Sequence, residues 1–532
     1  MSSHVRFRRA KAGLLPLAIV LAGTTAWALG SHGAKPTPAT ARCSPKVDIA
    51  DVLAHDPQVT RINNALDSTF AAAVAQLDSA PPSRQYDKIT LLGKLLLNDK
   101  NLSVNRNVAC ETCHAPDVAQ TGSVDIINRT IVAYPGSALN RVSARKPQTY
   151  RYGAAFAPVL HYDEARKTLV GGNFWDMRAT GVTLANPAAE QGQGPPLNPV
   201  EMALPDAACA VFRMSRGPYR GLFERVWGRQ SFAINWPSDV ERVCSTPAPA
   251  PPHDSLPVHL SPTDRGIALA TYNFMGLAMA SYEASPEISP FSSKFDSAVA
   301  HPDRQILTSD EQAGWALFRG KGKCNTCHLD GTDNRAGTRP ARATDPISPA
   351  SAADRGPLFT NFAAANTGIP RNPALRFYCE NKPDSAGFTP NPAGAAYVDR
   401  GVGAFLRSSG NPNAAWTRLA SSLDGAMRVP TVRNVDMRPS PEFVKVYMHN
   451  GYLKSLKEVV HFYNTRDALP RCEDDDAAGA RITCWPAPEV TANVDTTVGR
   501  LGLTSHEEDL IVAFLRTLTD APAASRPPRR GP

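Results

Sequence analysis

The sequence predicts a mainly α-helical protein with two domains and long loops. Apolar residues recur at helical spacing in four segments: Ile89 to Leu97, Thr308 to Phe318, Leu456 to Tyr463 and His506 to Leu518. Strand-like alternation is scarce, and 47 prolines indicate long loops rather than general disorder. A chain of 532 residues is too long for one compact core. We therefore expect more than one folded unit, each built mainly from helices.

The first thirty residues have the features of an export signal. A basic segment from Arg6 to Lys11 precedes an apolar stretch from Leu14 to Leu29, which ends in small residues. The alternative is an uncleaved membrane anchor. That reading is less favoured because the stretch is short for a span and Pro16 and Gly23 interrupt it. We predict a cleaved signal peptide over residues 1–30, a periplasmic location, and no stable membrane insertion after cleavage.

The net charge does not indicate a nucleic-acid partner. The formal charge is +8, and the four basic residues of the signal account for half of it. The remaining excess is small and is not gathered into a basic block. The mature protein is therefore mildly basic, and we expect no nucleic-acid binding.

Two C-x-x-C-H motifs decide the class of the protein. One is Cys110, Cys113 and His114 (CETCH), and the other is Cys324, Cys327 and His328 (CNTCH). Two thiols three positions apart can bond to the two vinyl groups of haem, and the adjacent histidine then supplies an axial nitrogen to the iron. A zinc site would leave both histidines unexplained, and a thioredoxin-like site needs a βαβ context that is not apparent. The sequence therefore predicts two covalently bound haem c groups.

Six further cysteines form an even set, which suits disulfides in an exported protein. Cys472 and Cys484 would close a short loop, and Cys209 and Cys244 fall within one predicted domain. Elimination leaves Cys43 with Cys379, although connectivity cannot be deduced from sequence alone.

A proline-dense stretch at 245–262 separates the two motifs and is predicted as an inter-domain linker. We therefore expect two cytochrome c-like haem domains with long loops, at 86–244 and 263–520. An N-terminal extension (31–85) and a flexible tail (521–532) complete the chain. In the second domain Ser309 is the expected N-cap of a helix, with Glu311 in its first turn. Loop insertions are expected at 380–394 and 468–497.

From about Leu91 to Leu518 the chain resembles the bacterial di-haem cytochrome c peroxidases and their MauG-like relatives. The resemblance rests on several blocks in the family's order. They are LLGKLLLNDKNLSVNRNVACETCH, FWD at 174–176, EQGQGPPLNPVEM at 190–202, GWALFRGKGKCNTCH, GPLFTNFAAANTGIP, RVPTVRNV and YMHNGYLKSLKEVVHFYN.

The resemblance implies that the N-terminal haem reacts with hydrogen peroxide and that the C-terminal haem relays electrons. Glu201 would be the distal carboxylate that takes a proton from bound peroxide and returns it to the leaving oxygen. Gln191 and Pro195 fall on distal-pocket positions. Trp175 matches the tryptophan that carries electrons between the haems. Next to it, Met177 replaces a common glycine, and six extra residues follow Arg178.

Two departures from the family pattern set the expected subtype. No histidine lies between Ala115 and Thr149, so the peroxidatic haem is expected to lack the histidine that blocks it in ordinary peroxidases. Fourteen positions after His449, where ordinary peroxidases have a methionine ligand, this chain has Tyr463, as MauG-like proteins do. A phenolate is a hard anionic ligand that favours highly oxidised iron, whereas methionine favours ferrous iron. Met448 is the rival ligand.

We therefore expect a di-haem c-type peroxidase-like oxidoreductase in which a His/Tyr-ligated second haem shares the oxidising equivalents, as two Fe(IV) centres. Its partners would be hydrogen peroxide and either an electron-donor protein or a protein substrate. One alternative is a conventional cytochrome c peroxidase that detoxifies peroxide with electrons from a small cytochrome. Another is a non-catalytic electron-transfer protein. The family's Ca²⁺ is possible but weakened, because Lys146 falls on the position of an asparagine ligand and a charged lysine cannot bind calcium.

Overall fold

The computed structural model describes residues 47–79, 81–138, 141–248, 257–331, 356–473 and 479–522. The predicted signal peptide, Cys43 and the centre of the proline-dense stretch lie outside these ranges. Within them no helix is long and apolar enough to cross a membrane.

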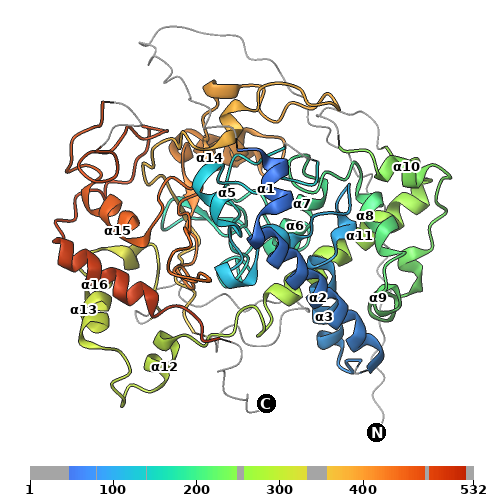
Figure 1. Ribbon diagram of the computed structural model, residues 1–532, viewed down its shortest axis with the longest axis horizontal. Coiled ribbons are helices and arrows are strands. Elements are labelled where there is room, and N and C mark those ends of the chain that lie inside the picture. The colour runs from blue at the N-terminus through green and yellow to red at the C-terminus, as the bar shows by residue number, and fades with distance from the viewer. Residues whose placement is uncertain are drawn as a thin grey trace.

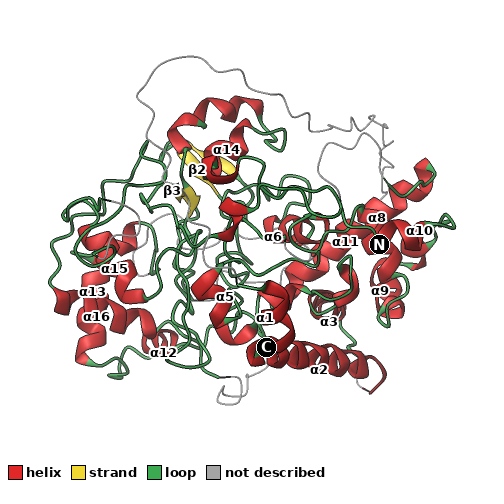
Figure 2. Ribbon diagram, turned by 45° about the horizontal axis from the view of Figure 1, so that its top comes forward, coloured by secondary structure: helices red, strands yellow, loops and turns green. Residues whose placement is uncertain are grey.

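Two groups of helices lie at opposite sides of the molecule, with long loops between them (Figures 1 and 2). One group contains α3 (Gln85–Leu97), α8 (Ala207–Met214), α9 (Arg220–Trp227) and α11 (Pro262–Glu283). The other contains α13 (Ser309–Arg319), α15 (Leu456–Thr465) and α16 (Ser505–Arg516). The mainly helical fold predicted from the sequence is confirmed. The predicted segments at 89–97, 308–318, 456–463 and 506–518 correspond to α3, α13, α15 and α16.

The remaining α-helices of the described residues are short, apart from α2. They are α1 (Ile49–His55), α2 (Pro57–Ser79), α4 (Cys110–Cys113), α5 (Asp125–Thr130), α6 (Pro187–Gly192), α7 (Gly194–Leu197), α10 (Val240–Cys244), α12 (Lys294–Ala300) and α14 (Gly401–Arg407). Short 3₁₀ turns are η1 (Lys100–Leu102), η2 (Pro116–Val118), η3 (Arg229–Phe232), η4 (Cys324–Thr326), η6 (Arg376–Cys379), η7 (Gly394–Ala396), η8 (Ala414–Leu419) and η9 (Ser421–Leu423).

Strands play a small part in the described fold. β1 (His161–Asp163) pairs antiparallel with β2 (Thr168–Val170), so that His161 faces Val170. β3 (Ala364–Ala365) pairs antiparallel with β4 (Met427–Arg428). Two-stranded ribbons of this length are not stable alone, so these depend on packing against the helices and loops.

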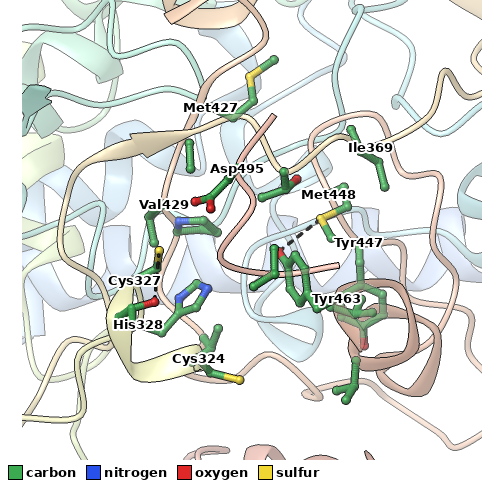
Figure 3. A pocket seen from close by; sticks show the side chains of 18 of the residues that line it. Cys324, Cys327, His328, Ile369, Met427, Val429, Tyr447, Met448, Tyr463 and Asp495 are labelled. Carbon is green, nitrogen blue, oxygen red and sulfur yellow. Dashed lines mark hydrogen bonds between the residues drawn. The ribbon is translucent and has the colours of Figure 1, made fainter. Parts of the chain in front are cut away.

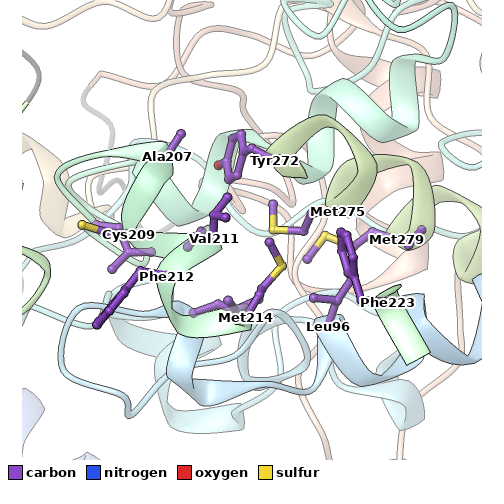
Figure 4. Packing of buried hydrophobic residues seen from close by; sticks show 14 of the residues in the cluster. Leu96, Ala207, Cys209, Val211, Phe212, Met214, Phe223, Tyr272, Met275 and Met279 are labelled. Atoms are coloured by element: carbon purple, nitrogen blue, oxygen red, sulfur yellow. The ribbon is translucent and has the colours of Figure 1, made fainter. Parts of the chain in front are cut away.

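The larger core lies where α3, α8 and α11 meet. Leu96, Met214, Met275 and Met279 are fully buried there (Figure 4). The second core is aromatic: Phe295, Phe318, Phe359 and Phe514 pack with ring centroids 5.1 to 6.4 Å apart. Each core supports one of the two C-x-x-C-H segments.

Helix α11 follows the predicted linker but packs against α3, α6 and α8, which precede it. Its buried face, including Met275 and Met279, belongs to the larger core. Phe295 of α12 is the first residue after it in the aromatic core. We therefore propose that the first domain extends through α11, beyond the boundary at 263 predicted from the proline content.

The start of α13 corrects one detail of the sequence analysis. The N-cap is Thr308 rather than Ser309: its hydroxyl accepts the Glu311 amide, and the Glu311 carboxylate accepts the Thr308 amide. Thr308 is the N-cap because only its spacing to Glu311 completes this reciprocal capping box.

Two predicted disulfides are confirmed: Cys209 with Cys244 and Cys472 with Cys484. Cys379 is also disulfide-bonded. Its expected partner, Cys43, lies outside the described residues.

Candidate active site

The first C-x-x-C-H segment opens into a cavity. Cys110 and Cys113 are free thiols at the two ends of α4, and His114 follows directly. The His114 Nδ1 lies 2.8 Å from the Gln120 carbonyl, which can only accept a hydrogen bond. This contact places the proton on Nδ1 and leaves the Nε2 lone pair available to a metal. Burial lowers the pKa of His114 to about 4, so the imidazole is neutral.

The second segment lines a larger cavity (Figure 3). Cys324 and Cys327 are again free thiols. The His328 Nδ1 lies 3.3 Å from the Phe359 carbonyl. Burial lowers the pKa of His328 as well. Both segments therefore offer two thiols and a neutral imidazole at the wall of a cavity. This donor set fits a covalently attached haem at each place.

The structure brings Glu201, Gln191 and Pro195 together on the wall of the first cavity. The Asn198 amide donates to Glu201 Oε1 at 2.5 Å. Burial raises the pKa of Glu201, while nearby Arg178 and the bond from Asn198 oppose that shift. A carboxyl group held at the wall of this cavity can accept and return a proton.

A tight backbone contact holds the Glu201 loop in place. The Ser137 amide donates to the Glu201 carbonyl at 2.6 Å. A Cβ atom on Gly136 would lie 2.5 Å from the Val200 carbonyl oxygen and 2.6 Å from that of Glu201. Only glycine allows this approach without moving the loop.

One acidic residue at the first cavity was not predicted from the sequence. Glu283, at the end of α11, lines the cavity and is only 1% exposed. Its Oε2 has no hydrogen-bond partner among the described residues, and burial raises its pKa well above the usual value. The carboxyl group is therefore held in its neutral form. No sequence signal marked it, because its position depends on how α11 packs.

Among the described residues that line the first cavity, His114 is the one histidine. His161, the next histidine along the chain, is exposed on β1, and its Nδ1 contacts the Val159 carbonyl.

Trp175 is buried at the wall of the second cavity and also lines a third cavity. That third cavity is bordered by Ala119 and Thr121, which follow the first motif, and by Met448 of the second site. The Trp175 Nε1 donates to the Lys146 carbonyl at 3.2 Å, and its ring centroid lies 6.4 Å from that of His449. Trp175 thus borders both the second cavity and the third, which the loop after the first motif also lines. Met177 nearby has φ 63°, a conformation that suits the glycine common in the family.

Tyr463 and Met448, the two rival ligands, both line the second cavity together with His328. The Tyr463 hydroxyl lies 3.9 Å from the Met448 sulfur. Burial raises the pKa of Tyr463, so the hydroxyl is neutral unless a cation holds its anion.

Two lysines are buried near the position expected for calcium. Lys146 is 8% exposed, and its amide donates to the His449 carbonyl. Lys445 is 4% exposed, and its ammonium donates to the carbonyls of Val118, Asn434 and Met437. Calcium binding stays a prediction.

Comparisons with known proteins match this geometry. The family model described as di-haem cytochrome c peroxidase matches residues 87–304. The methylamine utilization protein MauG of Paracoccus denitrificans (strain Pd 1222) is 29% identical over 438 residues, covering 82% of this chain and 89% of MauG. Over most of its length this chain is therefore similar to the di-haem cytochrome c peroxidases and MauG.

Two further proteins are similar in the same way. The crystal structure of the di-haem peroxidase BthA from Burkholderia thailandensis E264 is similar with a TM-score of 0.55 and 26% identity, over 81% of this chain and 86% of BthA. The cytochrome-c peroxidase IdrP2 of Denitromonas iodatirespirans is 26% identical over 223 residues, covering 41% of this chain and 42% of that protein. The protein is a peroxidase-type di-haem enzyme, and the matched family implies two c-type haems and hydrogen peroxide as substrate. The residues of both centres fit those haems.

Proposed function

We propose that the enzyme reacts with hydrogen peroxide at the His114 centre and shares the two oxidising equivalents with a second haem held by His328 and Tyr463. The observation that carries this proposal is the Tyr463 hydroxyl, which lies in the same cavity as His328. Haem iron, when bound, supplies the redox chemistry that divides the O–O bond. The steps below concern the residues of this chain.

Glu201 is proposed as the proton carrier of the peroxide step. As a carboxylate it takes the proton of the oxygen nearer His114 and delivers it to the departing oxygen. The Asn198 contact orients the carboxyl group for this exchange. Gln191 and Pro195 shape the pocket in which peroxide is positioned. Because the described lining of this cavity contains no second histidine, peroxide would reach the site without prior reduction.

Trp175 is proposed to carry one electron from the second centre to the first. Its ring lies on the wall of the second cavity, and its backbone partner Lys146 contributes to the charge around His114. Tyr463 would then stabilise the second centre after that electron leaves, since an anionic oxygen ligand favours the more oxidised iron. We also propose that the protein is exported to the periplasm and that its reductant is an electron-donor protein or an oxidisable protein substrate.

One observation favours the alternative, a conventional cytochrome c peroxidase. Met448 lies beside Tyr463, and a methionine ligand would suit a relay that accepts electrons from a small cytochrome.

Mössbauer spectroscopy of iron-57-labelled holoenzyme separates the two functions. The resting enzyme and the enzyme after one equivalent of peroxide are compared, with Tyr463→Met beside the wild type. We expect both irons of the wild type to leave the ferric state without prior reduction, and the second iron of the variant to remain ferric. An enzyme that ignores peroxide until it is half-reduced would support the conventional peroxidase instead.

A further inference from the structure

Met448 is placed to bind the same metal position as Tyr463. The two side chains come from different segments: Tyr463 from α15, and Met448 from the turn that precedes it. Figure 3 shows the Met448 sulfur turned toward the Tyr463 hydroxyl, with His328 to one side of the pair. The sulfur-to-oxygen distance is 3.9 Å, and both side chains line the cavity of the second haem. The two donor atoms therefore lie next to each other in one cavity.

The backbone of Met448 is held in an unfavourable conformation. Its φ is 64°, in the left-handed region that residues with a side chain usually avoid. The turn around it is fixed by several bonds: the Tyr447 amide to the Leu453 carbonyl, the Lys146 amide to the His449 carbonyl, and the Asn450 amide group to the Pro370 carbonyl. Strain of this kind persists where the surroundings impose it, and it gathers at functional sites. Here its effect is to direct the thioether into the cavity.

The two donors have opposite preferences for the oxidation state of iron. The phenolate oxygen of Tyr463 is hard and anionic, so it is favoured by ferric and more oxidised iron. The thioether sulfur of Met448 is soft and neutral, so it is favoured by ferrous iron. We propose that Tyr463 and Met448 exchange as the axial ligand opposite His328, with Tyr463 bound when the iron is oxidised and Met448 bound when it is ferrous. The proposal rests on the proposed function, which assigns Tyr463 as the ligand of the oxidised state.

The exchange balances as a one-electron, one-proton step. A one-electron donor, such as a small electron-transfer protein or dithionite, reduces ferric iron to ferrous. The iron–oxygen bond to Tyr463 breaks, the phenolate takes a proton from solvent, and an iron–sulfur bond to Met448 forms. Oxidation by the peroxide reaction reverses the step: the phenol releases its proton to solvent and displaces the thioether.

The exchange would give one centre two working states. With Tyr463 bound, the centre holds an oxidising equivalent. With Met448 bound, it stores an electron, because methionine ligation raises the reduction potential. Because the ligand changes with each redox step, the second haem would be reduced at one potential and reoxidised at another.

Methyl-carbon NMR of the intact holoenzyme with ¹³C-methyl methionine tests the exchange without altering the chain. In the dithionite-reduced protein we expect one methionine methyl signal to move strongly upfield, as a ligand lying over the haem ring must. In the ferric protein that signal should be absent from this region. Absence of a shifted methyl signal in the fully reduced wild-type protein would overturn the proposal.

Two leucine variants assign the signal. Met448→Leu conserves volume and is the change most easily tolerated in a packed site. Met427 lines the same cavity from β4, so Met427→Leu is the matched control. We expect the shifted signal to disappear in Met448→Leu and to persist in Met427→Leu. The gap between reductive and oxidative potentials in protein-film voltammetry should close in Met448→Leu alone. The proposed ligand exchange is wrong if the shifted methyl signal is lost in Met427→Leu, or if the gap between the two potentials is unchanged in Met448→Leu.

Tyr463→Phe separates this inference from the proposed function. If Tyr463 is the ligand of the oxidised state, the ferric spectrum of Tyr463→Phe must differ from that of the wild type. Met448 should then bind the iron of this variant in both the ferric and the ferrous state. An unchanged ferric spectrum would refute the ligand assigned in the proposed function. A changed ferric spectrum without a shifted methyl signal in the reduced wild type would refute the exchange alone.

Discussion

Trp175 and Lys146 are joined in two ways. The indole Nε1 donates to the Lys146 carbonyl at 3.2 Å, and the Lys146 ammonium lies 5.7 Å from the centre of the indole ring. The first contact fixes the ring, and the second places a positive charge beside it. A charge at that distance opposes removal of an electron from the ring by about 3 kcal/mol at an effective dielectric constant of about 20.

We therefore predict that electron transfer between the two haems depends on the charge of Lys146. Burial lowers the pKa of Lys146 to about 8, so the amine is charged below that pH and neutral above it. His449, whose ring centroid lies 6.4 Å from that of Trp175, has its pKa lowered to about 4 by burial and stays neutral throughout this range. Transfer should accelerate as the pH rises through about 8. Lys146→Met should be faster than the wild type below about pH 8, by at least about tenfold near neutral pH, and the two rates should converge above it.

Stopped-flow absorbance of the second haem after peroxide addition measures this rate. Lys167→Met is the matched control, because Lys167 is an exposed lysine paired with Glu164. Its rate should follow that of the wild type. Equal pH profiles for Lys146→Met and the wild type would show that the charge has no effect on Trp175.

The second prediction concerns the pH dependence of the peroxide step. Burial raises the pKa of Glu201, and the carboxyl group can take a proton from peroxide only when it is ionised. The rate should therefore fall as the pH drops through a value above the usual 4.5. Glu201→Gln should lower the rate by roughly 10²–10⁴-fold and abolish this acid limb.

Rapid mixing with peroxide over a pH series, with both haems attached, tests the role of Glu201. Asn198→Ala keeps the carboxyl group but removes the bond that lowers its pKa, so its acid limb should move to higher pH. A full-rate Glu201→Gln enzyme would exclude Glu201 as the proton carrier.

The third prediction follows from the buried carboxyl group of Glu283. Burial raises its pKa well above the usual 4.5, so the folded protein keeps a proton that the unfolded chain releases. The stability linked to that proton is fully present below about pH 4.5 and declines as the pH rises toward the folded pKa, by up to about 1.4 kcal/mol for each pH unit. Glu283→Gln, which cannot ionise, should gain thermal stability over the wild type as the pH rises.

Differential scanning calorimetry at several pH values gives the comparison. Glu287→Gln is a suitable control, because its half-exposed carboxylate pairs with Lys94. The advantage of Glu283→Gln should shrink toward low pH and should be absent from the control. A constant difference across the pH range would show that Glu283 is ionised in the folded protein.

Sequence patterns predicted the elements that depend on local order. The apolar spacing from Ile89 to Leu97 fits α3, and that from Leu456 to Tyr463 fits α15, since each presents one apolar face to a core. The two C-x-x-C-H motifs needed no tertiary information. The grouping of Glu201, Gln191 and Pro195 required the resemblance, because spacing alone does not show that one loop closes a cavity.

What the sequence could not predict depends on long-range packing. Proline content suggested a domain boundary before α11, but the apolar face of α11 completes the first core instead. Glu283 resembles an ordinary helix-terminal acid until that packing buries it. The φ of Met448 is likewise imposed by its surroundings rather than by its type.

The last prediction concerns Lys445, which ties the loop of the first motif to the second half of the chain. Its ammonium donates at 3.0 Å to Val118, at 3.2 Å to Asn434 and at 2.8 Å to Met437, so three carbonyls meet three donors. Val118 lies two residues before Gln120, whose carbonyl orients His114. Lys445→Met should leave these buried carbonyls without a partner and lower the stability of the fold by about 3 kcal/mol or more.

Hydrogen exchange measures the effect. Exchange should rise in Lys445→Met in the segment around Val118. Lys457→Met, at a half-exposed lysine on α15, should leave that segment unchanged. Equal protection in both variants would show that the first haem loop is held by other contacts.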